Sequence, residues 1–120
     1  MSLDEGTILL HNPACSKSRA ALLMLEERGG DFTVREYLLD PLSREELDVL
    51  QGFLGLSPLD WTRTGEAEWG ETGLGLGAAA EDVLDAIARA PRLLQRPILI
   101  RGGSARVGRP PERLLELLEE

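Results

Sequence analysis

The order of hydrophobic patterns along the chain is the feature that most limits how it can fold. Residues 7–11 (TILLH) form a short apolar run that ends at Asn12-Pro13, which predicts a buried strand followed by a turn. Residues 16–28 are strong helix formers with one apolar face, and Gly29-Gly30 ends that pattern. A second strand is predicted at residues 32–37. The chain therefore opens β-α-β.

The second strand is expected to bury one face. Phe32 and Val34 alternate with Thr33 and Arg35, and this period of two is typical of a strand with one covered side. The prediction is thus that Phe32 and Val34 both point into the core.

The sequence predicts a helix after this strand. Ser43 as N-cap with Glu46 three residues later forms a capping box, and Leu42 and Leu47 occupy the two positions of a hydrophobic staple. The apolar spacing continues to Leu54 before a glycine. We expect one well-capped helix over this stretch.

The remaining patterns complete a helical middle and a β-β-α end. A helical turn is predicted from residue 57 towards 65, residues 66–77 are glycine-rich and predicted to be irregular, and helical spacing returns at 78–88. Two short strands, 98–101 and 105–107, flank a Gly-Gly hairpin, and a final leucine-striped helix begins at Pro110-Pro111.

These elements predict an α/β fold with a mixed sheet. A β-α-β half and a β-β-α half, separated by a helical insertion at approximately 42–95, give a thioredoxin-like core. A chain of 120 residues with 42% hydrophobic residues buries enough surface for one core without disulfides. We therefore expect a single domain over residues 1–120.

The rarest residue types gather in one place. The only His (His11), the only Asn (Asn12), the only Cys (Cys15) and the only Lys (Lys17) fall within one short stretch of a chain that otherwise uses Arg for its positive charge. This stretch is the first candidate for chemistry.

Charge and cysteine count exclude several function classes. A net charge of −8 opposes the binding of a polyanion, so nucleic acid is not an expected ligand. No apolar run is long enough for a spanning helix and no leader is visible, so the expected location is the cytoplasm, away from the membrane. One cysteine cannot form an internal disulfide, a CxxC pair or a four-ligand zinc site, so no metal is expected.

Cys15 is the candidate reactive group. If the helix begins near Ser16, Cys15 lies at its N-terminus, where free N–H groups and the helix dipole favour a thiolate, and Lys17 and Arg19 add positive charge nearby. The alternative is a buried structural cysteine. His11 either acts as a base or shapes the loop, Asn12 is expected to fix the turn, and the hydroxyl of Ser16 is a further candidate.

The loop at residues 11–19, HNPACSKSR, resembles the catalytic loop of the ArsC family, the glutaredoxin-coupled arsenate reductases with a thioredoxin-like fold. The resemblance extends to further landmarks in the same order. These are Tyr37-Leu38, residues 54–56 ahead of Arg63, residues 96–98 and residues 108–112.

This resemblance implies a mechanism and a site. Cys15 would attack arsenate, Arg63, Arg96 and Arg109 would hold the oxyanion, and Pro97 would be a cis-proline beside the cysteine. Guanidinium groups suit this role because they pair bidentately with tetrahedral oxyanions. Glutathione would be the co-substrate and glutaredoxin the partner that regenerates the cysteine, with no tightly bound cofactor.

Two other functions stay open at this stage. One keeps the fold and the thiol in a glutathione-linked oxidoreductase with another substrate. The other is a non-catalytic regulator similar to the Spx proteins, which bind RNA polymerase. Spx-like proteins typically sense oxidation through a CxxC pair, and Ser18 stands here where the second cysteine would be.

Overall fold

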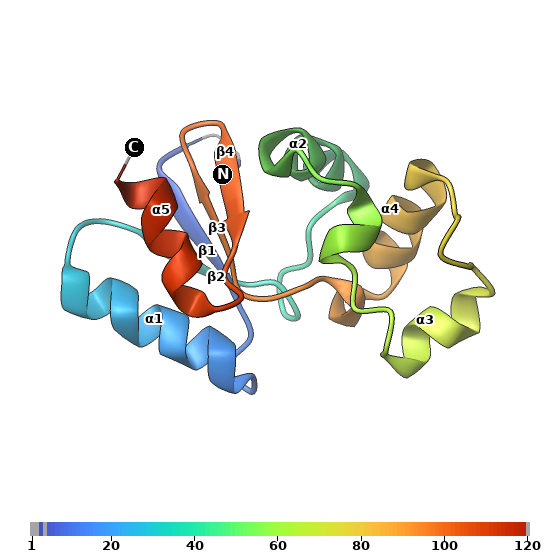
Figure 1. Cartoon of the computed structure of the whole chain (residues 1–120), viewed down its shortest axis with the longest axis horizontal. Coiled ribbons are helices and arrows are strands. Elements are labelled where there is room, and N and C mark those ends of the chain that lie inside the picture. The colour runs from blue at the N-terminus through green and yellow to red at the C-terminus, as the bar shows by residue number, and fades with distance from the viewer. Residues whose placement is uncertain (1–2, 4, 120) are drawn as a thin grey trace.

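The computed structural model describes residue 3 and residues 5–119, and its centre is a mixed four-stranded sheet in the order β2-β1-β3-β4 (Figure 1). β1 (Thr7–His11) pairs in parallel with β2 (Thr33–Glu36) and antiparallel with β3 (Ile98–Arg101). β3 in turn pairs antiparallel with β4 (Ser104–Val107). The fold is α/β and matches the predicted thioredoxin-like arrangement of strands.

Helices cover both faces of the sheet. One face carries α1 (Ser16–Arg28) and α5 (Leu114–Leu118), which follows the short 3-10 helix η3 (Pro111–Arg113). The chain between β2 and β3 folds into further helices, which extend to one side of the sheet in Figure 1. They are α2 (Arg44–Leu54), η1 (Pro58–Trp61), α3 (Ala67–Thr72), α4 (Ala80–Arg89) and η2 (Pro91–Leu93).

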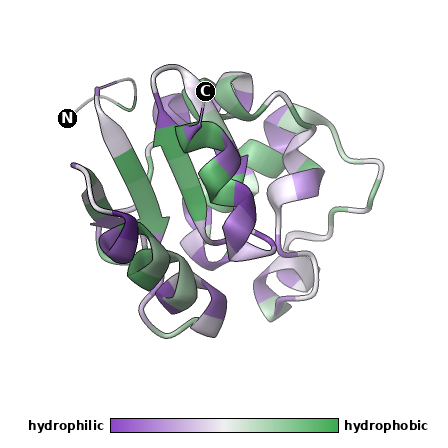
Figure 2. Ribbon diagram, turned by 60° about the vertical axis from the view of Figure 1, so that its left-hand side comes forward, coloured by the Kyte–Doolittle hydropathy of each residue, from purple (hydrophilic) through white to green (hydrophobic). Residues whose placement is uncertain are grey.

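β1 is buried on both faces, and this explains its continuous apolar sequence. Leu9 packs with residues of α1, β3 and α5 on one face of the sheet. Ile8 and Leu10 belong to the larger core between the sheet and the inserted helices. The strands are accordingly among the most apolar parts of the ribbon, while the helices show polar outer sides (Figure 2).

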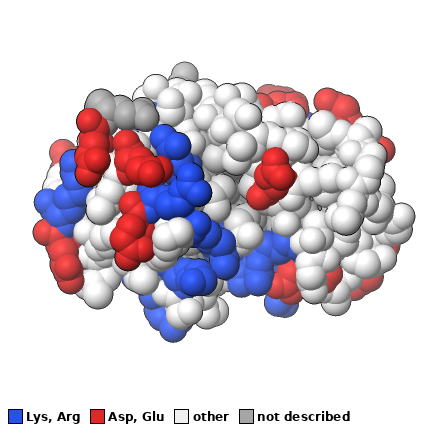
Figure 3. Space-filling view, viewed as in Figure 1, with Lys and Arg blue, Asp and Glu red and all other residues white. Residues whose placement is uncertain are grey.

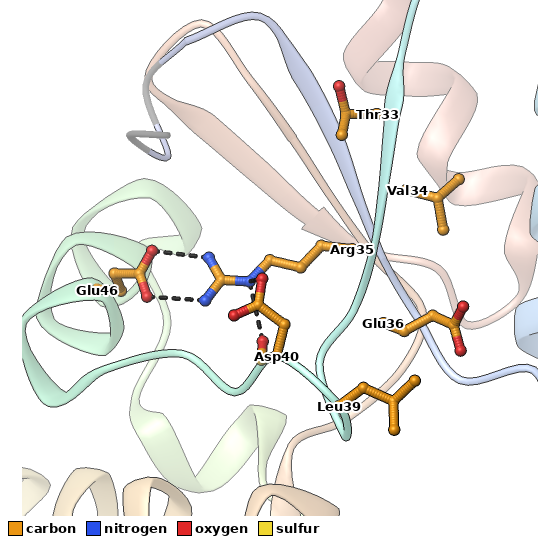
Figure 4. Close-up of a pocket in the computed structure, with 7 residues that line it drawn as sticks. All are labelled: Thr33, Val34, Arg35, Glu36, Leu39, Asp40 and Glu46. Carbon is orange, nitrogen blue, oxygen red and sulfur yellow. Dashed lines mark hydrogen bonds and ion pairs between the residues drawn. The ribbon is translucent and has the colours of Figure 1, made fainter.

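The capping box predicted for α2 is present and is tied to the sheet. The Ser43 hydroxyl accepts from the Glu46 N–H at 3.1 Å, and the Glu46 carboxylate accepts from the Ser43 N–H at 2.9 Å. The same carboxylate receives two hydrogen bonds from Arg35 of β2, at 2.7 and 2.9 Å (Figure 4). Glu46 therefore caps α2 and holds it against the end of β2.

Two predictions about local structure were wrong. Residues 66–77 are not irregular throughout, because α3 (Ala67–Thr72) forms there and buries Trp69. Val34 is not a core residue: it is 39% exposed, because β2 is an edge strand. Phe32 is partly buried and packs against the cluster around α1 and α5.

Gly108 allows a close approach of β4, Pro97 and α5. A Cβ at this position would lie 2.8 Å from Cγ of Leu114 and 3.0 Å from Cγ of Pro97. We predict that Gly108→Ala lowers the free energy of unfolding by about 1–3 kcal/mol, measured by urea denaturation.

Gly52 provides the matched control. It lies in α2, and a Cβ added there would have no heavy atom within 4 Å, so Gly52→Ala is expected to raise stability by about 0.5–1 kcal/mol. Equal effects of the two substitutions would contradict the packing described at Gly108.

Candidate functional site

The pairing register brings four separate segments to one end of the sheet. β1 and β2 are parallel, with His11 opposite Glu36. Tyr37 therefore lies at the same end of the sheet as the loop that follows β1. Ile98 begins β3 opposite Leu10 and is also opposite Val107, the last residue of β4. The segments 12–15, 96–97 and 108–109 therefore meet Tyr37 there.

Cys15 lies at the start of α1, as the sequence predicted. It is the N-cap residue, with φ −98° and ψ 125°, and it is partly buried. Its N–H donates to the Asn12 carbonyl at 3.0 Å, and its own carbonyl accepts from the Arg19 N–H at 2.9 Å. The Asn12 side chain accepts from the Ala14 N–H at 3.0 Å, which confirms that Asn12 fixes the turn.

The surroundings of Cys15 favour its thiolate. Burial raises the pKa of the thiol, but the N–H groups of Ser18 and Lys17 and the guanidinium of Arg96 stabilise the thiolate, and the net result is a lowered pKa. The positive charge that acts on the sulfur is therefore that of Arg96. Lys17 acts on the sulfur through its backbone N–H, and the Arg19 guanidinium donates to the Pro13 carbonyl at 2.9 Å.

His11 is held by a serine of α1. Its Nδ1 lies 2.7 Å from the Ser18 Oγ, which also accepts from the Asn12 N–H at 3.0 Å. Burial lowers the pKa of His11 and outweighs the charge of Glu36, which raises it, so the ring is neutral at neutral pH. A neutral ring protonated on Nε2 can accept a hydrogen bond at Nδ1 from the Ser18 hydroxyl. His11 and Ser18 together fix the loop that carries Cys15.

Arg96 and Arg109 lie together at the start of β3 and the end of β4. The Arg109 Nε donates to the Arg96 carbonyl at 3.1 Å. The Arg96-Pro97 peptide bond is cis, as the family resemblance implied, and the Arg109-Pro110 bond is also cis. The Gly108 N–H donates to the Pro97 carbonyl at 2.8 Å and joins the two segments.

Arg63 is placed differently. Its N–H donates to the Leu93 carbonyl at 2.7 Å, so its backbone runs beside the segment that leads to Arg96. Its guanidinium pairs with Glu66, with Nη1 and Oε1 2.5 Å apart. The structure thus brings Arg96 to Cys15 and Arg109 to Arg96, while Arg63 is paired with a carboxylate. Ser16 and Lys17 are exposed on the first turn of α1.

Two buried donors at the site lack a hydrogen-bond partner among the described residues. They are the Tyr37 hydroxyl and the Arg96 Nε. Buried donors without acceptors are uncommon, and a bound anion would supply acceptors for both. In the sequence alone, Tyr37 stands out only as a landmark of the family resemblance. The signal that could have found it is its place directly after a strand parallel to the one that leads to Cys15.

The described residues offer no metal cluster and no membrane span. No group of three or more His, Cys, Asp or Glu side chains in this part of the chain is arranged to hold a metal ion. No helix in residue 3 or residues 5–119 is long and apolar enough to cross a membrane.

Comparison with known proteins points to one family. The model of the ArsC family matches residues 10–117. An arsenate reductase of Neisseria meningitidis is 44% identical over 92% of this chain and 96% of its own length. An uncharacterized protein of the glnII region of Streptomyces viridochromogenes is 45% identical over 89% of this chain and 94% of its own. The solved arsenate reductase from Vibrio cholerae superposes with a TM-score of 0.86 at 39% identity, over 92% of this chain and 96% of that one.

The effect of Arg96 on Cys15 can be measured by alkylation. The rate of iodoacetamide reaction follows the thiolate fraction, so its midpoint in wild-type protein is expected below the free-thiol value of about 8.5. Because Arg96 stabilises the thiolate, Arg96→Gln should move the midpoint to higher pH.

Arg92→Gln is the control, since Arg92 is exposed and faces Glu66 and Glu68. It should leave the midpoint unchanged. A wild-type midpoint at the free-thiol value, or the same midpoint in the Arg96 variant, would argue against the described electrostatics.

Proposed function

Because the chain belongs to the ArsC family, we propose that it is an arsenate reductase, an oxidoreductase that converts arsenate to arsenite at Cys15. The relatives named arsenate reductase support this substrate, among them the Neisseria protein and one of Haemophilus influenzae that is 36% identical. The observation that carries the proposal is the partly buried thiol with a lowered pKa, which faces Arg96 at a sheet end where the buried Tyr37 hydroxyl and Arg96 Nε have no acceptor among the described residues.

The proposed reaction begins with attack of the Cys15 thiolate on arsenic. A sulfur–arsenic bond forms while one arsenic–oxygen bond breaks, and the departing oxygen takes up protons and leaves as water. Arg96 and Arg109 hold the remaining oxygens and offset their negative charge. The Arg96 guanidinium also keeps the attacking sulfur ionised.

The second step needs a thiol from outside the chain, because Cys15 is its only cysteine. We propose glutathione as this co-substrate. Its thiolate attacks the Cys15 sulfur, the electron pair of the sulfur–arsenic bond stays on arsenic, and arsenite leaves with arsenic reduced by two electrons. The product on the protein is a mixed disulfide, which glutaredoxin would reduce. Such a cycle fits the cytoplasm, where thiols are kept reduced.

A basic cavity beside the site supports a carboxylate-bearing thiol. A cavity of about 340 Å³ is lined by Arg106, Arg109 and Arg113 together with Asp60. On the face of the molecule shown in Figure 3, Lys and Arg side chains gather in a band near the middle. Glutathione carries two carboxylates, which guanidinium groups bind well. Arg109 borders both this cavity and the Arg96 segment.

The function is tested by arsenate-dependent oxidation of NADPH in the presence of glutathione, glutaredoxin and glutathione reductase. We expect turnover with wild-type protein and a loss of at least about 10³-fold with Cys15→Ser, because the nucleophile is removed. Reactions without arsenate and without glutaredoxin are the controls. No arsenate-dependent rate in the wild type would refute the proposal.

The ion pair of Arg63 gives a second prediction. If Arg63 binds the oxyanion, Glu66 competes with substrate for its guanidinium. Removing a partly exposed ion pair of ~0.5–1 kcal/mol should lower the KM for arsenate about twofold to fivefold in Glu66→Gln.

Glu68→Gln is the matched control, because the Glu68 carboxylate pairs with Arg92. Its KM should equal that of the wild type. An unchanged KM in Glu66→Gln would remove Arg63 from the proposed oxyanion site.

A further inference from the structure

Tyr37 occupies a position that the proposed mechanism leaves unused. It follows β2 directly, and the parallel register places it level with Asn12, at the sheet end where Cys15 lies. Its side chain is completely buried. Apolar residues of the insertion line a small cavity together with Tyr37, among them Leu42, Leu47 and Ile87. The insertion therefore holds the ring in place and leaves the hydroxyl at the site.

The Tyr37 hydroxyl has no acceptor in the described residues. The side chains of Asn12 and Arg96 are its polar neighbours, and Cys15 is close enough to act on it electrostatically. The Asn12 Oδ1 already accepts from the Ala14 N–H, and a guanidinium has no acceptor atom. The Tyr37 hydroxyl is left without a hydrogen-bond acceptor among the described residues, at a site whose other polar groups are mainly donors.

We infer that the Tyr37 hydroxyl donates a hydrogen bond to an oxygen of the tetrahedral oxyanion bound beside Cys15. This inference rests on the proposed function for the identity of the oxyanion. Tyr37 would be a neutral ligand among cationic ones, and the anion would satisfy the buried Tyr37 hydroxyl and the buried Arg96 Nε together.

The ionisation of Tyr37 agrees with this role. Burial raises the pKa of the phenol, and the charge of Cys15 raises it as well, whereas Arg96 and Asn12 act in the opposite direction. The net pKa is raised, so the hydroxyl keeps its proton at neutral pH and can donate.

The direct test measures arsenate binding by calorimetry in two proteins, the Cys15→Ser variant and the Cys15→Ser, Tyr37→Phe double variant. Neither can form the sulfur–arsenic bond. A hydrogen bond to a charged oxygen predicts binding about 10- to 100-fold weaker in the phenylalanine variant. Thr72→Val is the control: the Thr72 hydroxyl donates to the Trp69 carbonyl in α3, outside the site. It should leave the affinity unchanged. Equal affinities with and without the Tyr37 hydroxyl would overturn the inference.

Thermal melting separates ligand binding from a structural role. Because the Tyr37 hydroxyl has no hydrogen-bond partner among the described residues, Tyr37→Phe should not lower the Tm without anion, but it should reduce the stabilisation that added arsenate gives. A lower Tm without anion and an unchanged arsenate effect would instead assign the hydroxyl a structural role and overturn the inference.

A measurement on the intact side chain does not depend on the folding of a variant. Tyr37 is the only tyrosine, so 3-fluorotyrosine labelling gives one fluorine resonance for the chain. Arsenate is expected to shift this resonance in the Cys15→Ser protein, and an unmoved resonance at saturating arsenate would overturn the inference.

The reductase assay distinguishes the two proposals. Arsenate binding that depends on Tyr37, without turnover by the wild-type protein, would overturn the proposed function and support the assignment of Tyr37. Turnover by the wild-type protein, together with equal arsenate affinities in Cys15→Ser protein with and without Tyr37→Phe, would overturn the assignment of Tyr37 and leave the proposed function standing.

Discussion

The burial of β1 on both faces is the constraint on which the rest of the structure depends. Because this strand has a parallel neighbour on one side and an antiparallel neighbour on the other, the segments that leave β1, β2 and β4 and the one that enters β3 all meet at one end of the sheet. Leu9 and Leu10 point to opposite cores and fix the register, since a shift by one residue would exchange the faces of the strand. The site is a consequence of that register.

At this end of the sheet the local chemistry differs from that of the whole chain. The chain carries a net charge of −8, yet Cys15 faces the Arg96 guanidinium and the N–H groups that open α1. The neutral His11–Ser18 pair holds the loop without adding charge. An acidic protein can therefore offer a local site for a small oxyanion, because short-range charges and hydrogen bonds dominate there over the distant carboxylates.

The sequence predicted the elements whose signals are local. The capping box at Ser43 and Glu46, the turn at Asn12 and the helix start at Cys15 each depend on residues a few positions apart, and the structure contains all of them. α3 was missed because it is a short helix with a single buried residue, Trp69, and so shows no periodicity.

The remaining differences arise from contacts between distant segments. Val34 is exposed because of its place at the sheet edge, which alternation alone does not reveal. The convergence of Tyr37 with Arg96 depends on the register of β1 with β2 and β3. Sequence reasoning therefore named Cys15 and Arg96 but gave Tyr37 no role.

The central claim, that Cys15 and the donors at this sheet end form one oxyanion site, is tested most directly by a crystal structure of arsenate-soaked protein with anomalous scattering at the arsenic edge. We predict one principal arsenic peak bonded to the Cys15 sulfur, with its oxygens facing Arg96 and Tyr37; an ordered arsenic elsewhere, with this site empty, would contradict that claim.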